Sequence, residues 1–245
     1  MAPVYAALAA RAGALADGCG RRPAVVGLAG APGSGKSTAA TAVCRLVNDA
    51  LGPGVAVRLP MDGFHLRRSE LEAFPDPAEA FRRRGAPWTF DAAAFVEAVR
   101  MLGGGGGVGT GGAGGAPRRE LSFPGFDHGV GDPVPGAIRV SPGTRVVLLE
   151  GNYLLLQEPP WAEVRGLLDE AWFLDCGEEE AMARVARRHQ AVGRSREEAW
   201  ERVESNDRLN ARLIADSAPR ADLLVPGSPP PPGAGPLLIE QRRAS

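Results

Sequence analysis

The chain has 245 residues, enough for one domain with a sizeable core or for two small ones. Its formal net charge of −1 gives no overall field that would recruit nucleic acid or an anionic membrane. No apolar run approaches the roughly 20 residues of a membrane span. Cys19, Cys44 and Cys176 lack metal-ligand spacing, which indicates reduced thiols and a cytoplasmic protein. The oligomeric state stays open.

The N-terminal segment has two interpretations. Residues 2–16 are Ala-rich and carry Arg11 but no acid, which weakly resembles an organelle import sequence. Alternatively, Val4, Leu8 and Leu15 form the apolar face of a first helix that packs on the domain. We favour the packed helix.

The next predicted elements surround a phosphate-binding loop. A buried strand is predicted over 24–29 and a helix over 36–51, which Gly52-Pro53 ends. Between them lies a complete G-x-x-x-x-G-K-[ST] motif, and its Lys36 is the only lysine of the chain. Such loops bind phosphates through backbone amides and the helix N-terminus. The residues expected to hold the phosphate chain are Gly30, Ala31, Pro32, Gly33, Ser34, Gly35, Lys36, Ser37 and Thr38.

A second strand is predicted over 55–60, and Asp62 follows its carboxyl end. Ligands of open α/β sheets bind at the carboxyl ends of strands, so Asp62 is expected to face the phosphate loop. There it can orient or deprotonate an attacking hydroxyl. The alternative is a turn or a helix cap. His65 is a candidate substrate contact, although a purely structural histidine fits equally well.

A third strand, 145–150, ends in Glu150. An acid at the end of a buried strand beside the phosphate-loop strand is typical of a Walker B carboxylate. Ser37 and Glu150 are therefore the predicted Mg²⁺ ligands. The alternative for Glu150 is a surface cap.

Two polar helices are predicted later in the chain, over 178–192 and 197–212. The first carries an arginine cluster and is followed by glycine, which suits a lid over ATP as well as a solvated face. We expect Arg184 and Arg188 to contact ATP, with Arg188 screening charge on the transferring phosphoryl group. Further strands are predicted near 171–175 and 222–225.

Strand–helix alternation predicts an α/β fold, with a mostly parallel five-stranded sheet covered by helices on both faces. We expect one P-loop NTPase domain over 1–226, with a flexible Gly-rich insertion at 103–117 and an Arg-bearing lid helix. A Pro/Gly-rich, disordered tail is expected over 227–245, in which 237–239 offers a candidate last strand.

Taken together, these motifs resemble those of the P-loop small-molecule kinases grouped with uridine kinase, phosphoribulokinase and bacterial pantothenate kinase. The resemblance is closest to the nucleoside/nucleotide kinase-like branch. Its landmarks run in order through most of residues 24–225: Gly30–Ser37, Met61–His65, Arg84–Asp91, Phe123–His128, Leu149–Tyr153, Arg187–His189 and Gly193-Arg194.

The resemblance implies acceptor contacts that the residues alone do not reveal. It places Asp91 near sugar hydroxyls and lines an acceptor pocket with Phe126, Asp127 and His128. The sequence departs from the uridine kinase pattern after this stretch, where 129–132 replaces the usual downstream His and Arg. The phosphoribulokinase pattern, with a His beside the aromatic residue, is closer there but lacks the Arg84–Asp91 stretch.

The chain is thus predicted to be a kinase that uses ATP and Mg²⁺ to phosphorylate a hydroxyl of a small metabolite. Lys36, Asp62, Glu150 and Arg188 are the predicted catalytic residues. A nucleoside is the leading acceptor, and a sugar, sugar acid or pantothenate-like alcohol is the alternative. A nucleotide-dependent switch and a binding protein without turnover are the alternatives from other classes.

Overall fold

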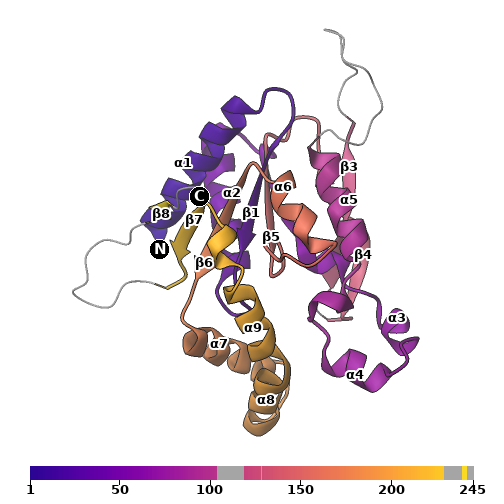
Figure 1. Cartoon of the computed structure of the whole chain (residues 1–245). Helices are drawn as coiled ribbons and strands as arrows, with labels where there is room; N and C mark the ends of the chain where they lie inside the picture. The colour runs from indigo at the N-terminus through magenta and orange to yellow at the C-terminus, as the bar shows by residue number, and fades with distance from the viewer. Residues whose placement is uncertain (104–118, 128, 229–238, 242–245) are drawn as a thin grey trace, which may run out of the picture.

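The structure is a computed structural model that describes residues 1–103, 119–127, 129–228 and 239–241 (Figure 1). Its main sheet has the strand order β2-β5-β1-β6-β7-β8. These strands are β1 (Ala24–Ala29), β2 (Ala56–Pro60), β5 (Val146–Gly151), β6 (Glu170–Asp175), β7 (Leu223–Pro226) and β8 (Glu240–Gln241). The first five strands in this order run parallel, and β8 adds a short antiparallel edge beside β7. The predicted five-stranded parallel sheet is confirmed.

Helices cover both faces of this sheet (Figure 1). On one face, α1 (Ala2–Gly18) and α2 (Lys36–Leu51) pack on β-strand residues such as Leu28, Leu148 and Trp172. On the other face lie α5 (Ala92–Leu102), α6 (Val164–Leu167) and the short 3-10 turn η3 (Trp161–Glu163). Because β1 and β5 are buried along their whole length, their sequences are continuously apolar up to the site.

The N-terminal helix packs on the domain, as the favoured interpretation predicted. Val4, Leu8, Ala12 and Ala16 recur every four residues and are buried in one apolar cluster with β1 and β6. Arg11 on this helix forms an ion pair with the buried Glu170 at the start of β6. Helix α1 is thus joined to the sheet by both apolar packing and charge.

A two-stranded antiparallel sheet stands beside the main one and was not predicted. It consists of β3 (Leu121–Asp127) and β4 (Asp132–Val140), with a register shift between Phe123 and Gly125. This hairpin packs on the 3-10 turn η1 (Met61–Phe64) that follows β2. The short helices α3 (Arg68–Glu72), α4 (Pro77–Arg82) and the turn η2 (Pro87–Thr89) complete this side.

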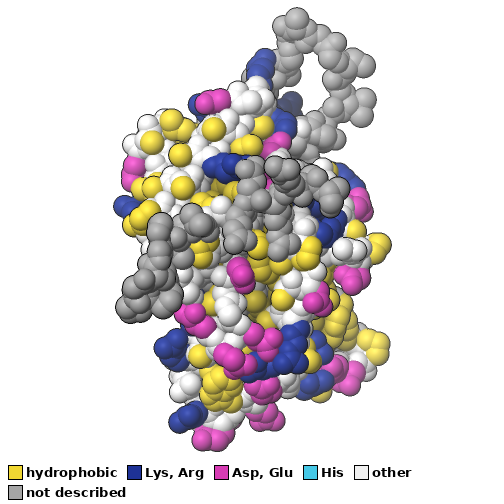
Figure 2. All heavy atoms as spheres, turned by 60° about the vertical axis from the view of Figure 1, so that its left-hand side comes forward, with side chains coloured by type: hydrophobic (Ala, Val, Ile, Leu, Met, Phe, Trp, Pro, Cys, Tyr) yellow, Lys and Arg dark blue, Asp and Glu magenta, His cyan; other side chains and the backbone are white. Residues whose placement is uncertain are grey.

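The C-terminal part of the chain forms a helical lobe next to the phosphate loop. Helix α7 (Glu178–Ala191) was predicted within one residue, but the expected single helix over 197–212 is divided. Helix α8 (Arg196–Arg202) passes through a π-helical turn (Val203–Asp207) into α9 (Arg208–Ala215), and η5 (Ala218–Arg220) leads to β7. Within this lobe, the buried Arg208 forms ion pairs with Glu178, Glu179 and Glu204. Acidic and basic side chains are interspersed over the surface of the lobe (Figure 2).

Several expectations fall partly outside the described residues. Of the Gly-rich insertion at 103–117, only Gly103 is described, and it caps α5. In the expected tail, Gly227 and Ser228 continue from β7, and β8 begins at Glu240, just beyond the 237–239 segment proposed as a strand. Within residues 1–103, 119–127, 129–228 and 239–241, every helix is too short or too polar to cross a membrane. The three cysteines are free thiols.

Candidate active site

The phosphate loop connects β1 to α2 through a tight turn of the backbone. Gly33 and Gly35 have φ angles of 78° and 98°, a region that only glycine occupies readily. A Cβ atom at Gly33 would also lie 2.2 Å from the carbonyl oxygen of Ala181 in α7. The hydroxyl of Ser34 is fully buried and has no hydrogen-bond partner among the described residues. The loop is therefore shaped as an anion cradle, held against the first turn of α7.

Lys36 lies at the centre of this cradle. Its ammonium donates to the Ala31 carbonyl at 2.9 Å, and its side chain is buried. Burial lowers the pKa of Lys36 to about 8; the charges of Glu150 and Asp62 oppose this shift, and the charge of Arg188 adds to it. The negative charges of a bound polyphosphate would stabilise the protonated form of this buried lysine.

Ser37 and Glu150 form a pair of oxygen donors beside the loop. The Ser37 hydroxyl donates to both Glu150 carboxylate oxygens, at 3.0 and 3.1 Å. Burial raises the pKa of Glu150 above its ordinary value, and the Lys36 charge counteracts the shift only in part. A hydroxyl and one carboxylate suit Mg²⁺, which commonly binds one or two carboxylates together with substrate phosphates and water. The donor set therefore fits the metal that the sequence predicted.

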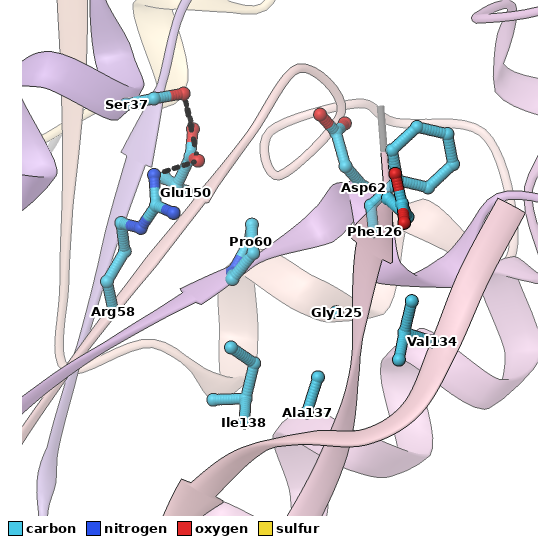
Figure 3. A pocket seen from close by; sticks show the side chains of 11 residues that line it. Ser37, Arg58, Pro60, Asp62, Gly125, Phe126, Val134, Ala137, Ile138 and Glu150 are labelled. Atoms are coloured by element: carbon cyan, nitrogen blue, oxygen red, sulfur yellow. Dashed lines mark hydrogen bonds and ion pairs between the residues drawn. The ribbon is translucent and has the colours of Figure 1, made fainter. Parts of the chain in front are cut away.

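A cavity of about 500 Å³ opens between the ends of β2 and β5 and the β3–β4 hairpin. Figure 3 shows Ser37 and Glu150 on one side, with Asp62 and Phe126 on the other. The lining residues are Ser37, Arg58, Pro60, Asp62, Gly125, Phe126, Asp127, Val134, Ala137, Ile138 and Glu150. The structure thus brings together five residues predicted from positions far apart in the sequence: Ser37, Asp62, Phe126, Asp127 and Glu150.

His65 supports this cavity from behind Phe126. Its ring lies between those of Phe90 and Phe126, with centroid separations of 4.0 and 4.8 Å. Its Nδ1 atom lies 2.9 Å from the backbone carbonyl oxygen of Asp62. The described contacts of His65 therefore hold the Asp62 turn and the Phe126 ring together.

The other predicted acceptor contacts have different outcomes. Asp91 is exposed and caps α5, where its carboxylate accepts from the Ala94 amide at 2.9 Å; it does not line the cavity. Asp127 lines the cavity and also accepts from the Gly129 amide at 2.7 Å. His128 lies outside the described residues.

The predicted lid arginines differ in their surroundings. Arg184 donates from Nη1 to the carbonyl oxygens of Gly33 and Ser34, at 3.3 and 3.4 Å, and so contacts the loop directly. Arg188 is exposed, yet its charge acts on Lys36. Thr38 is exposed in the first turn of α2.

Arg58 and Arg84 also lie at this site, although the sequence did not single them out as site residues. Arg58 lines the cavity and reaches Glu150 at 3.5 Å. The Arg84 guanidinium lies over the Phe126 ring, 5.9 Å from its centroid. The sequence feature that could have indicated Arg58 is a charged residue within the otherwise apolar strand 55–60. For Arg84, the sequence offered only its position at the start of a family motif.

Comparison with known proteins places the chain among kinases. No family model matches the chain. A Schizosaccharomyces pombe protein provisionally named a uridine kinase is 39% identical over 203 residues, which are 82% of this chain and 82% of that protein. A structure from Silicibacter sp. TM1040, provisionally described as a fructose transport system kinase, is 31% identical with a TM-score of 0.71 and covers 86% of this chain and 98% of its own. YFH7 from Saccharomyces cerevisiae, provisionally described as a P-loop containing kinase with a circular permutation, is 25% identical with a TM-score of 0.77 and covers 91% and 98%.

Proposed function

The chain belongs to the family of P-loop ATP-dependent kinases that are similar to uridine kinase, and from this premise we propose that it phosphorylates a hydroxyl group of a nucleoside. One observation carries this proposal. The cavity joins the phosphate-loop residue Ser37 to an acid, Asp62, and to an aromatic ring, Phe126. A residue of the phosphate loop, a carboxylate that can accept a proton and an aromatic ring that can pack against a flat base therefore line the same cavity.

The donor side is assigned to the phosphate loop. Lys36 and the loop amides bind the phosphate chain of ATP, and Arg184 and Arg188 extend the positive charge from α7. Ser37 and Glu150 would hold Mg²⁺, which supplies positive charge to the phosphate oxygens when it is bound.

Asp62 is assigned to the acceptor hydroxyl. It lies at the carboxyl end of β2, across the cavity from the Ser37–Glu150 pair (Figure 3). A carboxylate in this place accepts the hydroxyl proton and directs the oxygen toward the terminal phosphate. Because phosphoryl transfer depends mainly on positioning and charge, aligning the acceptor oxygen is the main contribution expected of this acid.

The walls of the cavity favour a nucleoside among the candidate acceptors. Phe126 gives an aromatic face, and Val134, Ala137 and Ile138 give an apolar floor. A base ring gains from such surfaces, whereas a free sugar needs mostly hydrogen-bonding partners. Asp127 would bind a hydroxyl or amino group at the same wall. His65 and Asp91 are assigned supporting roles, since one packs behind Phe126 and the other caps α5.

A sugar or related alcohol is the second candidate acceptor. The provisional name of the Silicibacter relative refers to a fructose transport system, and Asp62, Asp127 and Arg58 offer three charged groups for hydroxyls or an acidic substituent. The same cavity would bind either acceptor. The two proposals differ in the group that packs on Phe126, which is a base ring for a nucleoside and a sugar ring for a sugar.

The test is ATP consumption by the purified protein with Mg²⁺ against nucleosides, sugars, sugar acids and pantothenate, with mass spectrometry of the products. A phosphorylated nucleoside formed at the highest kcat/KM supports the proposal. Turnover of a sugar alone would transfer the assignment to the second candidate. Hydrolysis independent of every acceptor would favour a nucleotide-dependent switch.

A further inference from the structure

Arg58 has no role in the proposed phosphorylation of a nucleoside, although it lines the cavity. It comes from β2, an edge strand of the main sheet, and is the only cationic side chain among the described residues that line the cavity. Its Nη1 atom lies 3.5 Å from the Glu150 carboxylate (Figure 3). The Glu150 side chain is 7% exposed, while that of Arg58 is 37% exposed.

Glu150 needs a cation in the protein as it stands. A buried carboxylate is unfavourable unless it is paired, and the neutral Ser37 hydroxyl supplies hydrogen bonds but no charge. The Lys36 ammonium donates to the Ala31 carbonyl at 2.9 Å, so it acts on Glu150 through its charge and not through a direct ion-pair contact. Arg58 is the cation in ion-pair contact with Glu150 among the described residues.

A metal ion bound by Ser37 and Glu150 would share that carboxylate with Arg58. The two positive groups would then repel one another across a short distance, which lowers the affinity of the site for the ion. The phosphates of ATP bring enough negative charge to offset both cations. The loose contact of Arg58, at 3.5 Å and partly in solvent, lets its guanidinium move away without disturbing the strand.

We propose that Arg58 is a positioning residue that takes the place of the metal ion beside Glu150 in the nucleotide-free protein, so that Mg²⁺ binds only together with the phosphates of ATP. This inference rests on the proposed assignment of Ser37 and Glu150 to the metal. It adds a binding order to that assignment, with the nucleotide required before or with the ion.

The test measures metal binding without nucleotide, acceptor or turnover. Mn²⁺ replaces Mg²⁺ because its free concentration is followed directly by electron paramagnetic resonance, and the full-length protein is titrated as wild type, R58L, R58K and R45L. We expect R58L to bind Mn²⁺ on the order of tenfold more tightly than wild type, and R58K to stay within about threefold of wild type. R45L is the matched control for net charge, because Arg45 is exposed on α2 and its one ion pair among the described residues is with Asp49.

Equal Mn²⁺ affinities of wild type and R58L would overturn the proposal, as would weaker binding by R58L. If circular dichroism shows that R58L does not fold, R58Q, which keeps a hydrogen-bonding side chain without charge, is expected to show the same gain. Adding E150Q to R58L is expected to abolish the gain, and its persistence would move the ion away from Glu150. Because no acceptor is present, a failure of the nucleoside assignment leaves this result unchanged.

Discussion

A Cβ atom at Gly63 would lie 2.1 Å from the backbone carbonyl oxygen of Pro124. Gly63 directly follows Asp62 in η1, and Pro124 precedes Phe126 by two residues in β3. The hairpin wall of the cavity therefore rests on the turn that carries Asp62, and any side chain at position 63 would separate the two.

Gly63→Ala is expected to raise the KM for the acceptor at least about tenfold, because the added methyl group displaces the hairpin wall from the turn that carries Asp62 and so disrupts the acceptor pocket. The affinity for ATP should stay within about twofold, since the phosphate loop lies on the other side of the cavity. Steady-state kinetics with varied acceptor, together with calorimetry of ATP binding, measures both. Gly166→Ala, where an added Cβ meets open space, is the control and should leave both constants unchanged. An unaltered acceptor KM in Gly63→Ala would show that the hairpin does not position the acceptor.

ATP affinity is expected to fall as the pH rises above about 8. Burial lowers the pKa of Lys36 to about 8, so the free protein increasingly loses this charge above that pH, and ATP must then bind together with a proton. Calorimetric titrations at pH 7 and pH 9 in two buffers of different ionisation enthalpy detect the proton uptake. Lys36→Met should bind ATP weakly at both pH values, and a pH dependence that persists in this variant would assign the effect to another group.

The same lysine should make the nucleotide-free protein more stable in alkaline solution. The native pKa of about 8 lies below the ordinary value of 10.5, so between these pH values the unfolded chain binds more protons than the folded one. The free energy of unfolding therefore rises with pH in that window through this group, and the penalty of the buried charge is complete only below pH 8. Urea denaturation of wild type and Lys36→Met from pH 7.5 to 10 tests this. Wild type should gain stability relative to the variant, and a relative loss would contradict the sign.

Arg11→Met is expected to destabilise the fold by about 2–3 kcal/mol, because it leaves the Glu170 carboxylate buried with the Trp172 indole as its one side-chain hydrogen-bond donor in the described part of the chain. The double variant with Glu170→Gln should recover most of this loss, since the charge is then gone. Urea denaturation at pH 7 measures the three proteins. A single variant as stable as wild type would mean that α1 is held by apolar packing alone.

The donor half of the site could be predicted because its signals are local. The phosphate loop, its strand and its helix are contiguous in the sequence, and Asp62 and Glu150 each end an apolar run. In a parallel sheet, such strand ends necessarily meet at one edge. The structure shows Asp62, Ser37 and Glu150 lining one cavity, as that topology requires.

The acceptor wall could not be predicted in the same way. Pro124, Pro133 and Pro135 lie within β3 and β4, and prolines argue against strands except in small or edge sheets such as this hairpin. The family motif predicted that Asp91 contacts the acceptor, but its carboxylate caps the N-terminus of α5 instead, as an acid directly before a helix often does. The contact of Arg58 with Glu150 joins residues 92 positions apart, a pairing that only the folded sheet reveals.

The central claim is that Asp62 acts on an acceptor hydroxyl beside a nucleotide held by Lys36 and the phosphate loop. Acceptor-dependent turnover of ATP by wild type and Asp62→Asn, with ATP affinity measured on the same samples, tests it most directly. We predict that Asp62→Asn lowers kcat by about 10²–10⁴ while its affinity for ATP stays within about threefold. Acceptor phosphorylation by Asp62→Asn at the wild-type rate would contradict the claim.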